Sequence, residues 1–404
     1  MFMDENLHSR LSQSDLLNQA WLVVKQKGAA GGCDKVSISD FEKNFYEQIE
    51  SLLTEIQQKT YCPRPYKQVA IDKNKGGKRI LGLPSVRDKV LQMAVKLLIE
   101  PILEKIFLPS SYGYRPQKGP LKAVSRARHM IMNEKRDWVT ICDIDKYFDT
   151  IPHNALMEVF SKYISDPYIN TLVELWLKMG NIKNDYVWYD RYTGTPQGGV
   201  ISPLLANLYL HSLDEMMKSK GYYGYIRYAD DFIVLSHKEG EAFRALNDLR
   251  AYLTGNLQLT LNQGAHVKKV SEGFEFLGIY FTQNDTGISD EKFNRLKNNM
   301  AQAIKFTDGT PGYKLTEVLN GIARYYALIV GQEKLEMLDW ALLRLFKEKC
   351  VAAVKQKGLV DKHKLTTYLM NMPLFSDSMR QRRKMLIDEI IASTKNIAQV
   401  KLRE

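Results

Sequence analysis

Hydrophobic and polar positions follow two different patterns along the chain, and the change between them divides the sequence into two parts. Up to about residue 285, helical stretches alternate with short apolar runs that have the length of β-strands. From about residue 290 the helical period alone remains, over residues 291–305, 313–330, 333–356 and 379–393. The pattern therefore predicts an α+β part followed by an α-helical C-terminal region, with a boundary near residue 285.

The first part contains the strands of a predicted mixed sheet. A hairpin is expected over residues 66–85, around the turn Asn74–Gly77, after helices in 14–60 and before a helix from Ser85 to about Phe107. A nearly continuous apolar run from Val139 to Ile144 predicts a buried central strand. Residues 202–221 predict a helix that Ser202 would cap. Further strands are predicted over residues 223–228, 231–236 and 274–281.

Two adjacent aspartates, Asp230 and Asp231, interrupt the apolar run YIRYADDFIVLS. A turn at this point lets both side chains leave the sheet edge on one side, and Asp143 ends the predicted central strand. If the two elements are neighbours, the converging charges favour a hard cation such as Mg²⁺, which prefers oxygen ligands. Spacing alone favours the alternative, in which Asp143 caps the next helix and Asp230 and Asp231 form an ordinary turn.

The charge is unevenly distributed. The net charge is +11, and residues 291–404 contain 21 basic and 12 acidic side chains, a surplus of nine. A basic region with interspersed aromatic residues favours a nucleic acid partner, and the alternative is a solvated helical surface.

Other features predict a cytoplasmic protein without a membrane partner. Lys96 and Glu100 interrupt the apolar run of residues 90–103, so no membrane span is expected. The N-terminal segment MFMDENLHSR has neither the basic start nor the apolar stretch of a secretion signal. The four cysteines stand apart from one another and are expected to be reduced thiols.

Several longer motifs carry a resemblance to a known family. In chain order they are GGCDKVSISDFEKNF, GGKRILGLPSVRDKVLQMAV, SYGYRP, ICDIDKYFDTI, GTPQGGVISPLLANLYL, YADD, FEFLGIYF and LNGIARYY. Together they resemble the reverse transcriptases of the group II intron-like branch, from about residue 15 to residue 345. The resemblance implies a right-hand polymerase, with fingers and palm built on the mixed sheet and a basic α-helical thumb. Its expected domains are an N-terminal helical extension (1–60), the fingers and palm (61–285), and the thumb with a C-terminal RNA/DNA-binding region (286–404).

The same resemblance implies the roles of the acidic residues. Asp143 and Asp230 would bind two Mg²⁺ ions, for which Mn²⁺ is a substitute, and Asp231 would complete the cluster. Two such ions, about 4 Å apart, activate the attacking oxygen and stabilise the leaving oxygen in nucleotidyl transfer. The implied activity is that of an RNA-directed DNA polymerase, whose partners are an RNA template, a DNA or RNA primer and dNTPs.

Six further residues are implied to contact the nucleotide or template. Two cations at the hairpin exit would hold the triphosphate, a third would support the nucleotide or template side, and a Gln-Gly pair would lie under the templating base and nucleotide. An aromatic ring would act as a gate against the ribose 2′-hydroxyl, although composition alone favours a ring that anchors the helix in the core. In that order, these residues are Lys78, Arg79, Arg115, Gln197, Gly198 and Phe148.

The sequence departs from the family pattern at one position. Ala265 stands where the family commonly has a lysine that is a candidate proton donor to pyrophosphate, and His266, Lys268 and Lys269 remain open as substitutes. The chain also lacks a histidine-rich or cysteine-paired endonuclease segment after the thumb motif, which favours a non-mobile role such as antiviral defence, with a dedicated noncoding RNA as partner. The alternatives are an intron maturase or RNA-binding splicing factor, and a template-independent DNA polymerase.

Overall fold

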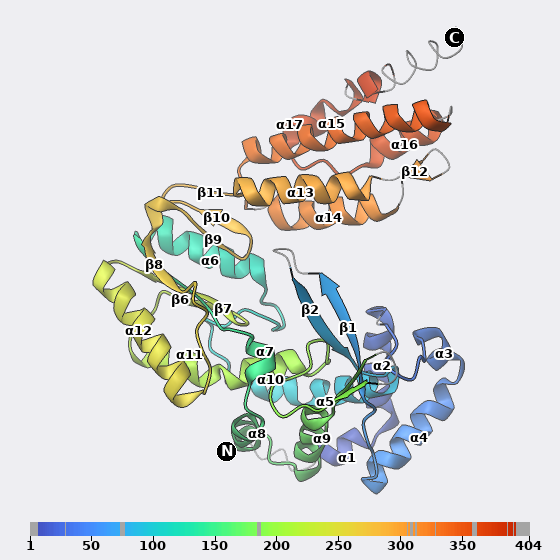
Figure 1. The fold of residues 1–404 in the computed structure, drawn as a ribbon, viewed down its shortest axis with the longest axis vertical. Helices are drawn as coiled ribbons and strands as arrows, with labels where there is room; N and C mark the ends of the chain where they lie inside the picture. The colour runs from blue at the N-terminus through green and yellow to red at the C-terminus, as the bar shows by residue number, and fades with distance from the viewer. Residues whose placement is uncertain are drawn as a thin grey trace. The chain divides into compact units, whose positions relative to one another are not determined.

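The computed structural model describes residues 7–28, 30–72, 77–183, 187–304, 306–307, 310–311, 313–327, 329–357, 362–385, 387–390 and 392. By its internal contacts the chain forms two units, each shown in Figure 1. Unit 1 comprises residues 1–123 and 138–268, and unit 2 comprises residues 124–137 and 269–404. The range expected to form the thumb, 286–404, lies wholly in unit 2, and the domain limits proposed from the sequence stay a prediction.

The first sheet of unit 1 contains the predicted central strand. Its order is β6-β7-β3-β8, with bounds Tyr225–Tyr228, Asp231–Ser236, Trp138–Asp143 and His266–Lys269. Both the β6–β7 and the β3–β7 pairs are antiparallel. Val139 and Cys142 are buried, as a central strand requires, and helix α12 (Glu239–Asn256) packs against β3 and β7. The register places Asp143 directly opposite Asp231.

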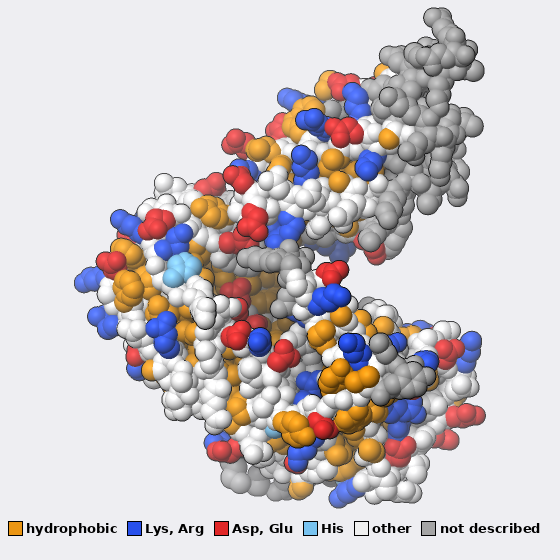
Figure 2. Space-filling model, viewed as in Figure 1, with side chains coloured by type: hydrophobic (Ala, Val, Ile, Leu, Met, Phe, Trp, Pro, Cys, Tyr) orange, Lys and Arg blue, Asp and Glu red, His pale blue; other side chains and the backbone are white. Residues whose placement is uncertain are grey.

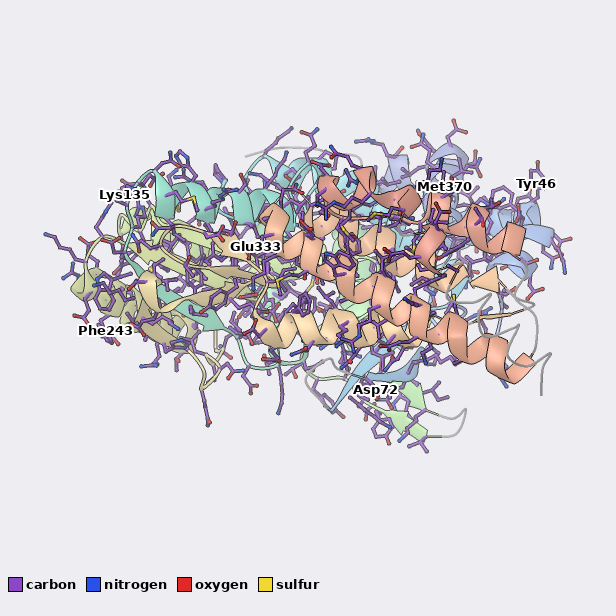
Figure 3. The ribbon with its side chains drawn as sticks, turned by 90° about the horizontal axis from the view of Figure 1, so that it is seen from above. Tyr46, Asp72, Lys135, Phe243, Glu333 and Met370 are labelled. Atoms are coloured by element: carbon purple, nitrogen blue, oxygen red, sulfur yellow. The ribbon has the colours of Figure 1, made fainter. Side chains whose placement is uncertain are left out.

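A second sheet of unit 1 has the order β2-β1-β4-β5. The predicted hairpin forms its first pair, β1 (Tyr66–Asp72) and β2 (Lys78–Leu83), although most of the predicted turn lies outside the described residues. Strands β4 (Asn181–Lys183) and β5 (Val187–Tyr189) were not predicted, and β4 joins β1 in parallel. In Figure 3 the labelled Asp72 marks the outer end of β1, with β4 and β5 beside it in green.

The helices of unit 1 bury one large apolar core. Helix α5 is central to it, because almost its whole first half is buried, and its N-cap Ser85 accepts a hydrogen bond from the backbone N–H of Asp88. The single helix expected over residues 202–221 is instead divided in two at Leu210, where the backbone ψ of −1° departs from the helical value. The bounds are α1 Leu7–Leu11, α2 Ser14–Gln26, α3 Ile38–Lys43, α4 Phe45–Gln58, α5 Val86–Glu104, α7 Tyr147–Thr150, α8 His153–Tyr163, α9 Pro167–Lys178, α10 Ser202–Tyr209 and α11 His211–Ser219.

Unit 2 combines a small sheet with helices. The prediction of one strand over residues 274–281 in the mixed sheet is wrong, because positive φ angles at Leu277 and Gly278 turn the chain there. The result is two short strands, β9 (Phe274–Phe276) and β10 (Ile279–Phe281), which form a separate three-stranded sheet with β11 (Thr286–Gly287). The remaining bounds are η1 Val270–Glu272, α13 Asp290–Ala303, β12 Phe306–Thr307, β13 Thr310–Pro311, α14 Tyr313–Tyr326, α15 Gln332–Lys357, α16 Lys362–Asn371 and α17 Asp377–Gln381, and α6 (Pro120–Met132) runs from unit 1 into unit 2.

In the described part of the chain, no helix combines the length and the apolar character that crossing a bilayer requires.

Candidate active site

Unit 1 contains a cleft of about 570 Å³ at one end of the first sheet, where β3 ends and the chain turns from β6 into β7. Its walls come from β2, from the β3–α7 turn and from the segment that precedes α10. Seven of the nine residues singled out from the sequence line it: Lys78, Arg79, Asp143, Phe148, Gln197, Gly198 and Asp230. The fold therefore brings together side chains that lie up to about 150 positions apart in the chain.

The acidic residues lie at one end of the first sheet. Tyr228 pairs with Asp231, so Ala229 and Asp230 form a two-residue turn, and Ala229 adopts a left-handed φ of +58°. Gly113 allows this turn to approach closely, because a Cβ at that position would lie 2.5 Å from the Ala229 nitrogen. Asp231 starts β7 opposite Asp143, so all three carboxylates emerge at the same sheet end, as expected from the sequence.

Two of these carboxylates have perturbed acidities. Burial and the charge of Asp230 raise the pKa of Asp143 to about 6, against the opposing effect of a hydrogen bond with Asn262. Burial also raises the pKa of Asp230, while Arg79 and Arg227 lower it. Repulsion between like charges therefore contributes to the cost of ionising this site, as expected where a cation normally binds.

The donor set can be tested against Mg²⁺. Within the described ranges, no three His, Cys, Asp or Glu side chains form a group that could hold a metal ion by itself. Mg²⁺ usually takes only one or two protein carboxylates and completes its shell with water and phosphate oxygens. Asp143 and Asp230, which face the same polar cleft beside Asn262, fit that requirement.

A buried ion pair supports the acidic turn from behind. Arg227 donates to both carboxylate oxygens of Asp214 over 2.7 and 2.6 Å, and both side chains are fully buried. The same guanidinium donates to Asn207 Oδ1 over 2.9 Å and to the carbonyl of Ala229 over 3.2 Å. Sequence reasoning missed this residue, although an arginine inside the apolar run YIRYADDFIVLS was a visible signal.

The cations of β2 face the acidic side of the cleft. Lys78 and Arg79 are exposed, and the charge of Arg79 acts on both Asp230 and Tyr114. Lys146 also lines the cleft, from a left-handed turn residue with φ +47°. The sequence had not indicated Lys146 or Tyr114 as cleft residues.

Arg115 lies elsewhere. Its guanidinium donates to the Glu104 carboxylate over 2.9 to 3.1 Å and to the carbonyls of Leu108, Ser111 and Phe107. It does not line the cleft, so its donors serve the loop that leads to Tyr114 rather than a ligand in that space. The expected direct contact of Arg115 with nucleotide or template has no counterpart in this geometry.

Phe148 and Gln197 form another wall of the cleft. The Phe148 ring makes edge contacts with Tyr114 and with Tyr147, at centroid distances of 6.4 and 5.6 Å. Gln197 donates from its side chain to Asp149 over 3.3 Å and accepts from the backbone N–H of Gly82 over 2.9 Å. The wall is therefore tied both to β2 and to the helix that carries Phe148.

Gly198 lets this wall lie close to β2. Its φ is +121°, and a Cβ there would lie 3.0 Å from the Gly82 carbonyl oxygen. A side chain at position 198 would have to displace backbone, so the close approach depends on glycine.

The segment where the family commonly has a lysine supplies no cation to the lining of the cleft. Ala265 is half-buried, and neither it nor His266, Lys268 or Lys269 is among the cleft residues. His266 Nδ1 lies 2.6 Å from the carbonyl oxygen of Gly264. Lys146 is a cleft-lining cation, and it lies in the turn that follows Asp143 at the end of β3.

The chain matches known proteins over most of the region that builds this cleft. The model of the family described as reverse transcriptase (RNA-dependent DNA polymerase) matches residues 71–281. Protein YkfC of Escherichia coli is 31% identical over 303 residues, which cover 65% of this chain and 79% of YkfC. The group II intron-encoded protein LtrA of Lactococcus lactis is 34% identical over 189 residues, which cover 46% of this chain and 31% of LtrA. This chain therefore spans well under two thirds of LtrA.

The fold is also similar to that of a solved structure. A telomerase from Candida albicans, in complex with a fragment of telomeric RNA, has a TM-score of 0.51 at 13% identity, over 89% of this chain and 66% of that one. At this identity the likeness concerns the fold alone. It confirms the expected α+β class and its polymerase architecture.

Proposed function

Because this chain belongs to the reverse transcriptase (RNA-dependent DNA polymerase) family, and to its group II intron-like part, we propose that it copies RNA into DNA. The observation that carries the proposal is the cleft in which Asp143 and Asp230 face the exposed cations of β2. A carboxylate pair opposite cations is the arrangement that nucleotidyl transfer from a triphosphate requires.

The cleft residues have separate roles in binding the metal ions and the triphosphate. Asp143 and Asp230 would hold two Mg²⁺ ions, with Asp231 beside them, and the bound ions would supply activation of the attacking oxygen and stabilisation of the leaving oxygen. Lys78 and Arg79 bind the triphosphate by charge-assisted hydrogen bonds. This division is supported by the lining of the cleft, which contains both carboxylates and both cations.

The opposite wall selects the nucleotide. Gln197 and Gly198 form a surface against β2 on which the templating base and the incoming nucleotide lie. Phe148 stands beside the sugar, and its ring, packed against Tyr114 and Tyr147, excludes a ribose 2′-hydroxyl by steric contact. Arg115 supports this wall indirectly, by holding the loop that carries Tyr114.

The test is primer extension on an RNA template with purified protein. Asp143→Asn and Asp230→Asn should each lower the rate by about 10³-fold or more, because electrostatic stabilisation is usually the largest catalytic contribution. Asp145→Asn is a matched control, since Asp145 also lines the cleft but is not assigned to the metal or the nucleotide. Full DNA synthesis by either of the first two variants would contradict the proposal.

The biological role is a separate question. We keep a non-mobile role such as antiviral defence, with a dedicated noncoding RNA, as a prediction, and splicing of intron RNA as its alternative. Sequencing the RNA and cDNA that copurify with the parent and with Asp230→Asn separates them. A single noncoding RNA with matching cDNA supports the first role, and flanking intron RNA supports the second.

A further inference from the structure

The sheet that forms one wall of the cleft exposes an unusual group of aromatic rings. Trp188, Tyr189 and Tyr192 are 49%, 44% and 79% exposed, all within five positions of the chain, and we call them the aromatic patch. Ile71 and Ile80, on β1 and β2 of the same sheet, are exposed as well. Figure 2 shows hydrophobic side chains gathered over the region where Figure 1 draws this sheet, with Lys and Arg side chains among them. Such a group on the surface indicates a binding role.

Two of the rings are held in place rather than left mobile. The Asp190 carboxylate accepts the indole N–H of Trp188 over 2.6 Å with one oxygen and the hydroxyl of Tyr192 over 3.1 Å with the other. Gly180 gives the indole room to lie against the backbone, because a Cβ there would stand 2.5 Å from the Trp188 ring. Rings that are fixed before binding lose little conformational entropy when a ligand stacks on them.

The patch is continuous with the cleft. Arg191, which precedes Tyr192 in the chain, donates to Asn181 Oδ1 over 2.9 Å and lies over the Tyr66 ring. Thr193 donates to the backbone carbonyl of Asp149 over 3.0 Å, and the Asp149 side chain accepts from Gln197 in the cleft wall. Tyr192 and Gln197 are five positions apart in the chain, so at most about 18 Å of chain separates them.

The size and surroundings of the patch favour one kind of occupant. The exposed area of the three rings is about 350 Å², from about 200 Å² for each whole aromatic side chain. A stable protein–protein interface buries about 800 Å² on each partner, so the patch is too small for one, but it suits two or three stacked bases. Lys183 lies opposite Val187 on the neighbouring strand, which provides positive charge beside the patch for a phosphate backbone.

We propose that the aromatic patch binds the unpaired RNA template ahead of the cleft, by stacking its bases on Trp188 and Tyr192. The inference rests on the proposed function, because it assigns the patch to the template of that reaction. The limit of about 18 Å corresponds to at most about five nucleotides at about 3.4 Å per step, so the bases that reach the rings lie within about five positions 5′ of the templating base. Stacking tolerates any base sequence, which suits a template that must move past the site.

The test measures binding rather than synthesis. A DNA primer is annealed to an RNA template with a ten-nucleotide 5′ overhang, and affinity is measured by fluorescence anisotropy. A second template has the same overhang without bases, so that its phosphates remain while stacking is lost. The parent should bind the template whose overhang has bases about 5- to 100-fold more tightly than the template whose overhang lacks them, given the usual gain in affinity per stacked base.

The variants then locate the effect. Trp188→Ala/Tyr192→Ala should bind both templates equally, with an unchanged dependence on salt because no phosphate contact is removed. Trp188→Phe/Tyr192→Phe should keep most of the preference. Tyr223→Ala is the matched control, since Tyr223 is an exposed tyrosine of unit 1 outside the patch and the cleft.

Several results would overturn the inference. The first is a parent protein that binds neither template, or that binds both with equal affinity. The second is a double alanine variant whose affinity for both templates falls by the same factor. The third is a double alanine variant that changes only in its self-association, measured on a sizing column. Failure of the proposed function is distinguishable. A parent that prefers the overhang with bases but extends no primer contradicts DNA synthesis, while normal synthesis without that preference contradicts only the patch.

Discussion

Replacing Arg227 with methionine should destabilise unit 1 and also disturb the acidic turn. Arg227 and Asp214 are both fully buried, so the change leaves the Asp214 carboxylate without its cation, while the hydroxyl of Tyr225 still donates to it over 2.9 Å. Removing one partner of a buried ion pair costs about 3–5 kcal/mol. At about 2–4 °C per kcal/mol for a unit of this size, the Tm should fall by about 6–20 °C.

The double variant Arg227→Met/Asp214→Leu separates stability from function. Replacing a whole buried pair by apolar side chains is often neutral for stability, so its Tm should return towards that of the parent. Its activity should stay low, because the carbonyl of Ala229 still lacks the guanidinium donor that holds the turn before Asp230. A displacement of about 1 Å at a reacting group costs about 100-fold in rate.

The assays are thermal unfolding and primer extension at increasing Mg²⁺ concentration. Both Arg227 variants should need more Mg²⁺ for half-maximal rate than the parent. Asp88→Asn is the control, because Asp88 is a buried carboxyl of unit 1 that accepts from Tyr61 and Ser85 and does not line the cleft. It should leave the Mg²⁺ requirement unchanged. A double variant with the stability, rate and Mg²⁺ requirement of the parent would refute the positioning role of Arg227.

Three further predictions concern the cleft. Phe148→Val should admit ribonucleotides while keeping much of the dNTP activity, and a side-by-side extension assay with NTPs and dNTPs would reveal an unchanged selectivity if the ring is not the gate. Arg79→Ala should raise KM for dNTPs by about 10-fold or more through loss of a charge-assisted contact, and an unchanged KM would exclude that contact. The pKa of Asp143 is raised to about 6 from the ordinary aspartate value of 3.8, so its ionisation opposes folding as pH rises from 3.8 through 6. Asp143→Asn should therefore raise the Tm more at about pH 7.5 than at about pH 4.5, and equal gains in melting curves at the two pH values would contradict the perturbation.

Much of the site could be read from local signals. An aspartate at the end of an apolar run, a two-aspartate interruption between two strands and a basic hairpin exit are visible without tertiary structure, because strand period and turn chemistry act over a few residues. These signals brought Asp143 and Asp230 to attention, whereas Arg79 was assigned through the family resemblance, and all three line one cleft. Exposed aromatic residues have no such signal. Nothing in the order of Trp188, Asp190 and Tyr192 shows whether the rings are buried.

The sequence by itself determined the α+β class, the order of the motifs and the helical character of the C-terminal part. Only the tertiary structure decided which long-range partners each residue meets. It pairs β1 with β4, more than a hundred residues away, and it places β9 and β10 in a sheet of their own. It also engages Arg115 with Glu104 and buries Arg227 against Asp214. These outcomes depend on which strands pair and on which charged side chains are buried and desolvated together. The energies of strand pairing and desolvation arise from packing between different segments rather than from any local pattern.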